Sequence, residues 1–166
     1  MRVVRSFLKI LRVTTKPTHI KEAASVELPR DAATIWSFMW DPASSVKTEE
    51  STELGVTLPG TLQGLGEIQV FITRTADGRV GSLQEVVELD PGRRAVTRSL
   101  NSSYRTYGAL TIEVLGPSSC RLTQEFWVDL PPGLEVAWVR QYRDSFKRQL
   151  NLLMLRLSEL APTLPT

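Results

Sequence analysis

The sequence contains one cysteine, Cys120, and one histidine, His19, in 166 residues. A disulfide needs two cysteines and a structural zinc site needs about four ligands, so neither a disulfide framework nor a Cys/His zinc site can form within this chain. Apolar runs are short, and none approaches the roughly 18–20 residues that a membrane-spanning helix requires. We therefore expect no metal, no cofactor and no multi-pass membrane protein.

Catalytic constellations are equally scarce. His19 lies at the edge of the first predicted strand and Cys120 lies beside a turn, and neither has an orienting partner at a supporting spacing, so both are interpreted as structural residues. Gly60, Gly64 and Gly66 do not form a phosphate-binding loop, because neither a helix nor a Lys-Ser/Thr pair follows them. The sequence thus argues against nucleophilic catalysis and nucleotide binding.

The composition is otherwise that of an ordinary single domain, with 42% hydrophobic and 23% charged residues. The net charge of +2 hides an asymmetry. Residues 1–21 carry six basic and no acidic side chains, whereas residues 22–166 carry 14 basic and 18 acidic ones. The body of the chain therefore lacks the basic face of a nucleic-acid binder, and no nucleic-acid partner is expected.

Residues 1–18 form a basic segment outside the predicted domain. Its Arg and Lys side chains recur every three or four residues, which on a helix gives a basic stripe beside an apolar face. Such a helix is typical of an element that docks on a membrane surface or a partner, and the alternatives are that it packs on its own domain or extends the first strand. Charges interrupt its apolar stretch and serine is scarce, so neither a secretory signal nor a mitochondrial presequence is expected. We expect a cytoplasmic protein, with peripheral membrane contact as an alternative, and the oligomeric state stays open.

Turn residues divide residues 19–130 into a strand, two short helices and a series of further strands. Asp31 is placed to cap a helix over 32–40, and Asp41 is placed to cap a second short helix that ends near residue 46. Alternating apolar positions and turn pairs such as Asp77-Gly78 predict an antiparallel meander. The predicted strands are 19–28, 52–58, 67–74, 80–89, 94–100, 104–115 and 121–130.

The hydrophobic period changes to that of a helix after the Pro-Pro-Gly sequence at 131–133. From there apolar residues step by three or four positions until Pro162 ends the pattern. We predict a long helix over 134–161 with one apolar stripe. The stripe consists of Val139, Tyr142, Phe146, Leu150, Leu153, Leu157 and Leu160.

About seven strands and one long helix leave few arrangements, and the predicted fold class is α+β. The sheet must bury one face and the helix offers one stripe, so the sheet is expected to curl around the helix. One helix cannot fill the concave side of so wide a sheet. We therefore expect a cavity between them, and such cavities usually hold apolar ligands.

Four local sequences in this order carry a resemblance to a known superfamily. They are LPRDAATIWSFMWDP at 28–42, the Gly64/Gly66 pair before a strand, VVELDPGRRAVTRS at 86–99 and GALTIEVLGPSSCRLTQEF at 108–126. Together they resemble the helix-grip fold of the START domains, the birch-pollen-allergen group and the bacterial polyketide cyclase/dehydratase and lipid-transport proteins (SRPBCC). The resemblance covers about residues 19–161 and implies one ligand-binding domain there, with residues 1–18 and 162–166 outside it. It implies a curved antiparallel sheet of about seven strands around a long C-terminal helix, with two short helices after the first strand.

Alternation along three strands places Glu85, Arg98 and Gln124 on otherwise apolar faces. A buried charge costs several kcal/mol unless it is paired. Inward placement therefore predicts either a Glu85–Arg98 ion pair on neighbouring strands or contact of these side chains with a polar ligand group. The alternative is a reversed register or a bulge, which would place them outside.

Aromatic side chains are the second set of candidate ligand contacts. Five of them are expected near the helix–sheet interior, namely Trp36, Phe126, Trp138, Tyr142 and Phe146. Tyr104 and Tyr107 are expected near the mouth of a hairpin. In the resembled fold the C-terminal helix and the strands facing it line the pocket, which favours Tyr142 and Phe146 as ligand contacts, and plain core packing is the alternative. A tyrosine hydroxyl in such a cavity can position a carbonyl or a phenol.

Three functions follow as hypotheses. In the first, the protein is a carrier or sensor that binds an apolar small molecule such as a lipid, quinone or polyketide. In the second, which the resemblance implies, it is a cyclase, aromatase or dehydratase in which Arg98 polarises a carbonyl and Glu85 or Tyr142 moves protons. In the third, it is an interaction module that docks through residues 1–18.

Overall fold

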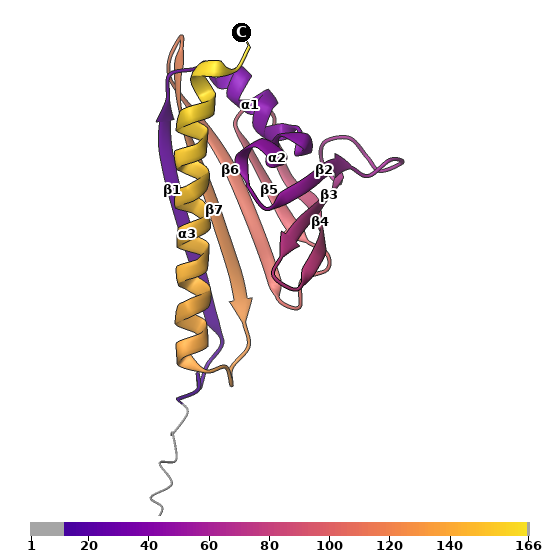
Figure 1. Cartoon of the computed structure of the whole chain (residues 1–166), viewed down its shortest axis with the longest axis vertical. Helices are drawn as coiled ribbons and strands as arrows, with labels where there is room; N and C mark the ends of the chain where they lie inside the picture. The colour runs from indigo at the N-terminus through magenta and orange to yellow at the C-terminus, as the bar shows by residue number, and fades with distance from the viewer. Residues whose placement is uncertain (1–11, 166) are drawn as a thin grey trace, which may run out of the picture.

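A seven-stranded antiparallel sheet curves around one long helix in the computed structural model, which describes residues 12–165 (Figure 1). The sheet order is β1-β7-β6-β5-β4-β3-β2, so the first strand closes against the last and the other strands form a meander. The strands are β1 (Thr18–Leu28), β2 (Thr52–Thr57), β3 (Ile68–Thr75), β4 (Gly78–Asp90), β5 (Arg94–Ser99), β6 (Arg105–Gly116) and β7 (Ser119–Leu130). The helices are α1 (Ala32–Trp40), η1 (Pro42–Ser44), α2 (Ser45–Thr48), α3 (Val136–Leu160) and η2 (Ala161–Thr163). The predicted helix-grip architecture is confirmed.

Two aspartates set the helices that follow β1. Asp31 caps α1 by accepting hydrogen bonds from the backbone N–H of Thr34 at 2.9 Å and from its hydroxyl at 2.8 Å. These two bonds lower the pKa of Asp31 below its usual value. Asp41 then caps η1 by accepting from the N–H of Ala43 at 3.0 Å. Where the sequence predicted one helix to about residue 46, the structure has a 3₁₀ turn followed by one α-helical turn.

Gly55 of β2 lets η1 pack directly on the sheet. A Cβ atom at this position would lie 1.9 Å from the carbonyl oxygen of Pro42 and 2.6 Å from the hydroxyl oxygen of Ser45. Only a residue without a side chain permits this approach. The contact holds η1 and α2 over the concave face of the sheet.

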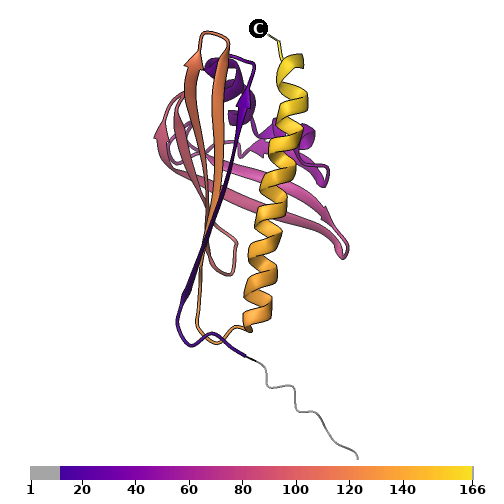
Figure 2. The ribbon, with the colours of Figure 1, turned by 90° about the vertical axis from the view of Figure 1, so that its left-hand side faces the viewer.

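The helix α3 lies along β1 and β7, as Figure 2 shows. Its C-terminal half packs tightly on the sheet. Leu153, Met154 and Leu157 are buried in one hydrophobic cluster, and Leu150 is buried as well. Its N-terminal half carries half-buried Val139, Tyr142 and Phe146, which pack on Ile20, Val128 and Leu130. The predicted apolar stripe therefore faces the sheet along the length of the helix.

Glu22 interrupts the apolar alternation of β1, and the structure explains why. It lies on the inner face of the strand, where its side chain is 17% exposed and faces α3. The Nε atom of Arg143 lies 3.3 Å and the Nζ atom of Lys147 lies 3.8 Å from its carboxylate oxygens. A charge is tolerated at this interface because two cations of α3 accompany it.

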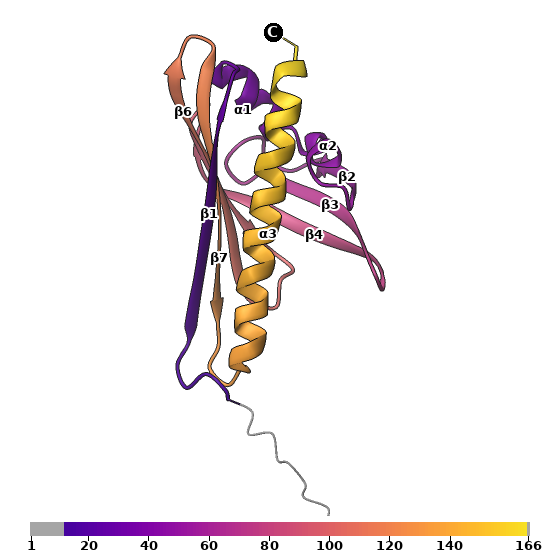
Figure 3. The same cartoon turned by 60° about the vertical axis from the view of Figure 1, so that its left-hand side comes forward.

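The sheet is wider than the helix that covers it. The β3–β4 hairpin, β2 and α2 lie on the opposite side of α3 from β1 in Figures 1 and 3. The short helices cover one end of this remaining concave surface, and a cavity lies between them and the strands.

The chain before β1 is joined to the turn that precedes α3. Val13 forms an isolated bridge with Glu135, and Thr14 N–H donates to the carbonyl oxygen of Leu134 at 2.7 Å. Most of the predicted basic segment, residues 1–11, lies outside the described residues. Among residues 12–165, no helix is long and apolar enough to cross a membrane.

Candidate functional site

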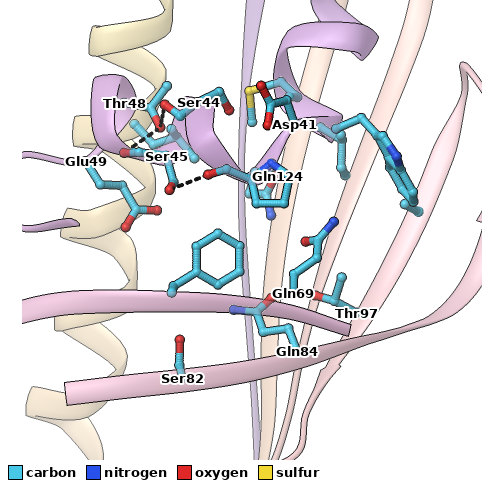
Figure 4. A pocket seen from close by; sticks show the side chains of 18 of the residues that line it. Asp41, Ser44, Ser45, Thr48, Glu49, Gln69, Ser82, Gln84, Thr97 and Gln124 are labelled. Carbon is cyan, nitrogen blue, oxygen red and sulfur yellow. Dashed lines mark hydrogen bonds between the residues drawn. The ribbon is translucent and has the colours of Figure 1, made fainter. Parts of the chain in front are cut away.

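A cavity of about 190 Å³ lies between the short helices and the concave face of the sheet. Figure 4 shows its polar side chains, with Ser44, Ser45, Thr48 and Glu49 on the helical side and Gln69, Ser82, Gln84 and Thr97 on the sheet side. The lining residues come from α1, η1, α2, the strands β3 to β7 and α3, and the helical part begins with Met39, Trp40, Asp41 and Pro42. The cavity predicted from the width of the sheet is therefore present.

Glutamine and threonine side chains form the floor of the cavity. Gln69 and Gln84 are directly opposite each other in the register of β3 and β4. The hydroxyl of Thr97 donates to Oε1 of Gln84 at 2.9 Å, and Nε2 of Gln69 donates to a carboxylate oxygen of Glu67 at 2.9 Å. Gln124 of β7 also lines the cavity, as the sequence predicted from strand alternation. Neutral hydrogen-bonding groups thus face any molecule held here.

An apolar wall completes the cavity beside Gly108 of β6. A Cβ atom on Gly108 would lie 3.1 Å from the Phe126 ring and 3.4 Å from the Thr97 hydroxyl. The missing side chain lets the Phe126 ring approach β6, and Leu110 and Leu153 extend the apolar surface. A flat apolar group can lie against this wall while its polar groups reach the floor.

The cavity opens towards α3 through a second, wider groove of about 1200 Å³. The two spaces share six lining residues, which are Thr48, Glu49, Thr73, Gln84, Phe126 and Leu153. At this opening Glu49 accepts a hydrogen bond from the Thr52 hydroxyl at 2.9 Å. Exposed Leu152 and Leu155 line the outer part of the groove. The groove therefore adjoins the cavity along these six shared residues.

Most of the predicted aromatic contacts form a ladder along α3 rather than the cavity wall. Ring centroids are 6.3 Å apart for Tyr104–Trp138, 4.9 Å for Trp138–Tyr142, 4.8 Å for Tyr142–Phe146 and 5.8 Å for Phe146–Phe126. Only the last ring of this ladder, Phe126, lines the cavity. Burial, and then the neighbouring Tyr104, raise the pKa of Tyr142, so its hydroxyl stays protonated at neutral pH. Tyr104, Tyr142 and Phe146 pack against the cluster of Ile20, Val128 and Leu130, and their role as ligand contacts stays a prediction.

Two predicted aromatic contacts lie away from the cavity. Trp36 packs against the core beside α1 and stacks on Trp40 with a centroid distance of 5.5 Å, and Trp40 is the one that lines the cavity. Tyr107 lies on the outer face of the sheet, where it stacks on Trp127 at 5.3 Å. The predicted place of Trp36 at the helix–sheet interior is thus confirmed, whereas neither Trp36 nor Tyr107 lines the cavity.

Glu85 and Arg98 form the predicted ion pair, but on the outer face of the sheet. They are in one cross-strand row with Tyr107, Trp127 and Lys21. The prediction that they point inward is wrong. Arg98 shares its face of β5 with buried Val96, and this is the outer face because Ala95 and Thr97 line the cavity. Glu85 lies outside because of a β-bulge in β4 between Val86 and Glu88. One extra residue there reverses the alternation, so extending the pattern of 87 and 89 back to 85 selects the wrong face.

The same bulge explains which cavity residues the sequence analysis missed. With the alternation reversed before Val86, the inward side chains of β4 are Ser82 and Gln84, and the paired strand contributes Ala95 and Thr97. Gln69, Phe71 and Thr73 of β3 face inward by simple alternation. The only signal in the sequence was that polar residues occupy these strand positions. Without independent evidence for the bulge, the sequence did not show that these residues face inward.

The two residues interpreted as structural keep that interpretation. Cys120 is buried, and burial together with the charge of Asp31 raises the pKa of its thiol, which disfavours the reactive thiolate. His19 lies on the surface, where its Nδ1 atom is 2.8 Å from Asp129. In the described part of the chain, no group of three or more His, Cys, Asp or Glu side chains is arranged to hold a metal ion.

The fold is shared with solved structures of low sequence identity. The Zhui aromatase/cyclase from a Streptomyces species matches with a TM-score of 0.70 and 15% identity over 87% of this chain and 94% of that one. A START superfamily protein from Mycobacterium smegmatis matches with 0.66 and 15%, over 86% and 99%. Norcoclaurine synthase from Thalictrum flavum, solved in complex with dopamine and hydroxybenzaldehyde, matches with 0.66 and 10%, over 100% and 97%. No protein-family profile and no curated protein matches the sequence.

These similarities show the fold of the chain. The chain has the SRPBCC/START-like helix-grip fold found in START superfamily and aromatase/cyclase proteins. At 10–15% identity the likeness is one of architecture, so the use of the cavity has to be argued from its own residues.

Proposed function

We propose that this protein binds a small, mainly apolar molecule in the cavity under α1 and α2, as a carrier or sensor. The observation that supports this most is the cavity itself, which has an apolar wall at Gly108 and Phe126 opposite a floor of neutral amides and hydroxyls. Apolar pockets with a few convergent polar groups are the usual form of small-molecule sites. Lipid, quinone and polyketide-like molecules fit this description.

Binding without chemistry is favoured by the side chains that line the cavity. Its floor carries Gln69, Gln84, Gln124 and Thr97, none of which titrates near neutral pH. Arg98 and Glu85, which a cyclase mechanism would have used, lie on the other face of the sheet. A neutral floor orients a ligand but supplies little acid or base catalysis.

A cyclase, aromatase or dehydratase acting on a polyketide-like substrate is the second candidate. It draws support from the carboxylates of Asp41 and Glu49 at the helical side of the cavity, which are potential proton acceptors. It also draws support from the activities of two structural relatives, an aromatase/cyclase and norcoclaurine synthase. Docking through residues 1–18 stays a separate proposal, tested by deleting residues 1–17 and measuring membrane or partner association.

Native mass spectrometry of the purified full chain, followed by denaturing extraction, tests the proposal. We expect a bound species of defined mass that is lost in Gly108→Val, because the added side chain enters the space beside Phe126. Gly81→Val is the matched control, since a Cβ atom there meets only Ile72 Cδ1 at 3.6 Å. Equal retention of the species by both variants would contradict binding in this cavity.

The same extraction separates the two candidate functions. Recovery of the molecule unchanged after incubation with the protein agrees with a carrier or sensor. A mass change that requires the protein and disappears in Glu49→Gln and Asp41→Asn would favour the enzyme.

A further inference from the structure

We propose that Glu67, a buried carboxylate beside the cavity, makes Gln69 present a hydrogen-bond acceptor to the ligand, so that the cavity selects a neutral hydroxyl group. This inference rests on the proposed function and concerns the chemistry of the ligand. It follows from the hydrogen bonds around three side chains, Glu67, Gln69 and Gln84.

Glu67 is unusually buried for a glutamate, with 4% of its surface exposed to solvent. Its Oε2 atom accepts the backbone N–H of Gly64 at 3.2 Å. Its Oε1 atom accepts the Thr57 hydroxyl at 3.3 Å and Nε2 of Gln69 at 2.9 Å. In residues 12–165 it has no ion-pair partner, so neutral donors alone hold it. The reverse turn at Gly64 and Gly66, with φ of 81° and 83°, delivers one of these donors.

A carboxylate can only accept, and this decides which way the amide of Gln69 faces. Oxygen and nitrogen of a glutamine amide occupy nearly the same space, so hydrogen-bond partners fix the orientation. With Nε2 held by Glu67, the Oε1 atom of Gln69 is left for the cavity that this side chain lines. Gln69 therefore offers the ligand an acceptor.

Gln84 is oriented in the opposite sense. Its Oε1 atom accepts the Thr97 hydroxyl, which leaves its Nε2 group as a donor. Gln69 and Gln84 are cross-strand partners, so their side chains emerge about 5 Å apart at Cβ. One acceptor and one donor side by side match a hydroxyl group, which donates to Gln69 and accepts from Gln84.

The charges around the cavity favour a neutral hydroxyl over an anion. Among the described residues that line it, the only acidic or basic side chains are Asp41 and Glu49. No lysine or arginine is there to pair with an anionic ligand. The ligand class is thus a neutral molecule that carries a hydroxyl group on a flat apolar body, which lies against Phe126.

The variant Glu67→Gln tests this by changing one group. The N–H of Gly64 can only donate, so the new amide must turn its oxygen to Gly64 and its NH₂ group to Gln69. Gln69 then has to turn its own oxygen to residue 67 and its NH₂ group to the cavity. The cavity loses its acceptor at Gln69 and offers two donors.

Two probes read this reversal by isothermal titration calorimetry with the full chain at neutral pH. 2-Naphthol can donate and accept, whereas 2-methoxynaphthalene can only accept. We expect the wild type to bind 2-naphthol about tenfold more tightly, the usual effect of one buried hydrogen bond, and Glu67→Gln to bind the two probes about equally. Partial unfolding would lower the apparent affinity for both probes by the same factor. The ratio of the two affinities therefore reports the amide orientation and not the folded fraction.

Two further variants complete the experiment. Gln69→Leu removes the amide, so it should bind both naphthalene probes without a preference for 2-naphthol. Any remaining difference between the probes measures the effect of the methyl group of 2-methoxynaphthalene. Glu113→Gln, on the outer face of β6, should keep the wild-type ratio. Binding of both probes with the same ratio in wild type and Glu67→Gln would overturn the role of Glu67 alone. Binding of neither probe to the wild type would contradict the proposed function, and this inference with it.

Discussion

Gly55→Ala is expected to displace η1, which lines the cavity, because η1 packs directly on Gly55 of β2. The new Cβ atom would start 1.9 Å from the carbonyl oxygen of Pro42, whereas real contacts of this kind are not shorter than 3.0 Å. The 3₁₀ turn must therefore move by at least about 1 Å, and it carries Ser44 and the start of α2 with it. Overpacking of this size costs about 1–3 kcal/mol.

Urea unfolding of Gly55→Ala and of the control Gly81→Ala provides the measurement. We expect the unfolding midpoint of Gly55→Ala to fall at unchanged m-value, because the native state is strained while the surface exposed on unfolding stays the same. Gly81→Ala meets only an ordinary contact at 3.6 Å and should change the free energy of unfolding by no more than about 0.5 kcal/mol. Equal midpoints for the two variants would show that η1 does not rest on Gly55 as described.

Three further predictions concern the sheet and the helix. Hydrogen bonding from Lys21 lowers the pKa of Glu125 below its ordinary value. This carboxylate therefore stabilises the fold above pH about 4.3, and the contribution is lost as the pH falls through the lowered pKa. In Glu125→Gln, the free energy of unfolding should fall less steeply as the pH is lowered. Phe146→Ala should lower the free energy of unfolding by about 2–4 kcal/mol, because it removes the ring between Tyr142 and Phe126. Leu155→Ala, on the exposed side of α3, is the control. A smaller loss in Phe146→Ala than in the control would contradict the packing of these rings. Native Cys120 should react with iodoacetamide far more slowly than the denatured chain at pH 8, and equal rates would mean that the thiol is accessible.

Much of the architecture was predictable from the sequence because local patterns agreed with one another. Asp31 in front of an apolar run gave the start of α1, and the steps of three and four from Val139 to Leu160 gave α3. Turn residues bounded each strand within a few positions. The cavity followed from counting strands against one helix.

The candidate site was harder to predict because it depends on one irregularity. The bulge at Val87 has no distinctive residue, yet it decides whether Gln84 or Glu85 faces the interior. The apolar alternation of β1 was interrupted by Glu22, whose partners Arg143 and Lys147 lie more than a hundred residues away. Contacts of this kind are set by tertiary structure, and no local pattern encodes them.

Binding of 2-naphthol to the full-length wild type and to Gly108→Val, measured side by side by isothermal titration calorimetry, examines the cavity most directly. If the cavity is the ligand site, the wild type binds the probe with one site per chain, and Gly108→Val loses binding while it still unfolds in a cooperative transition. Binding of equal affinity and stoichiometry to both proteins would place the probe elsewhere and contradict the proposed function.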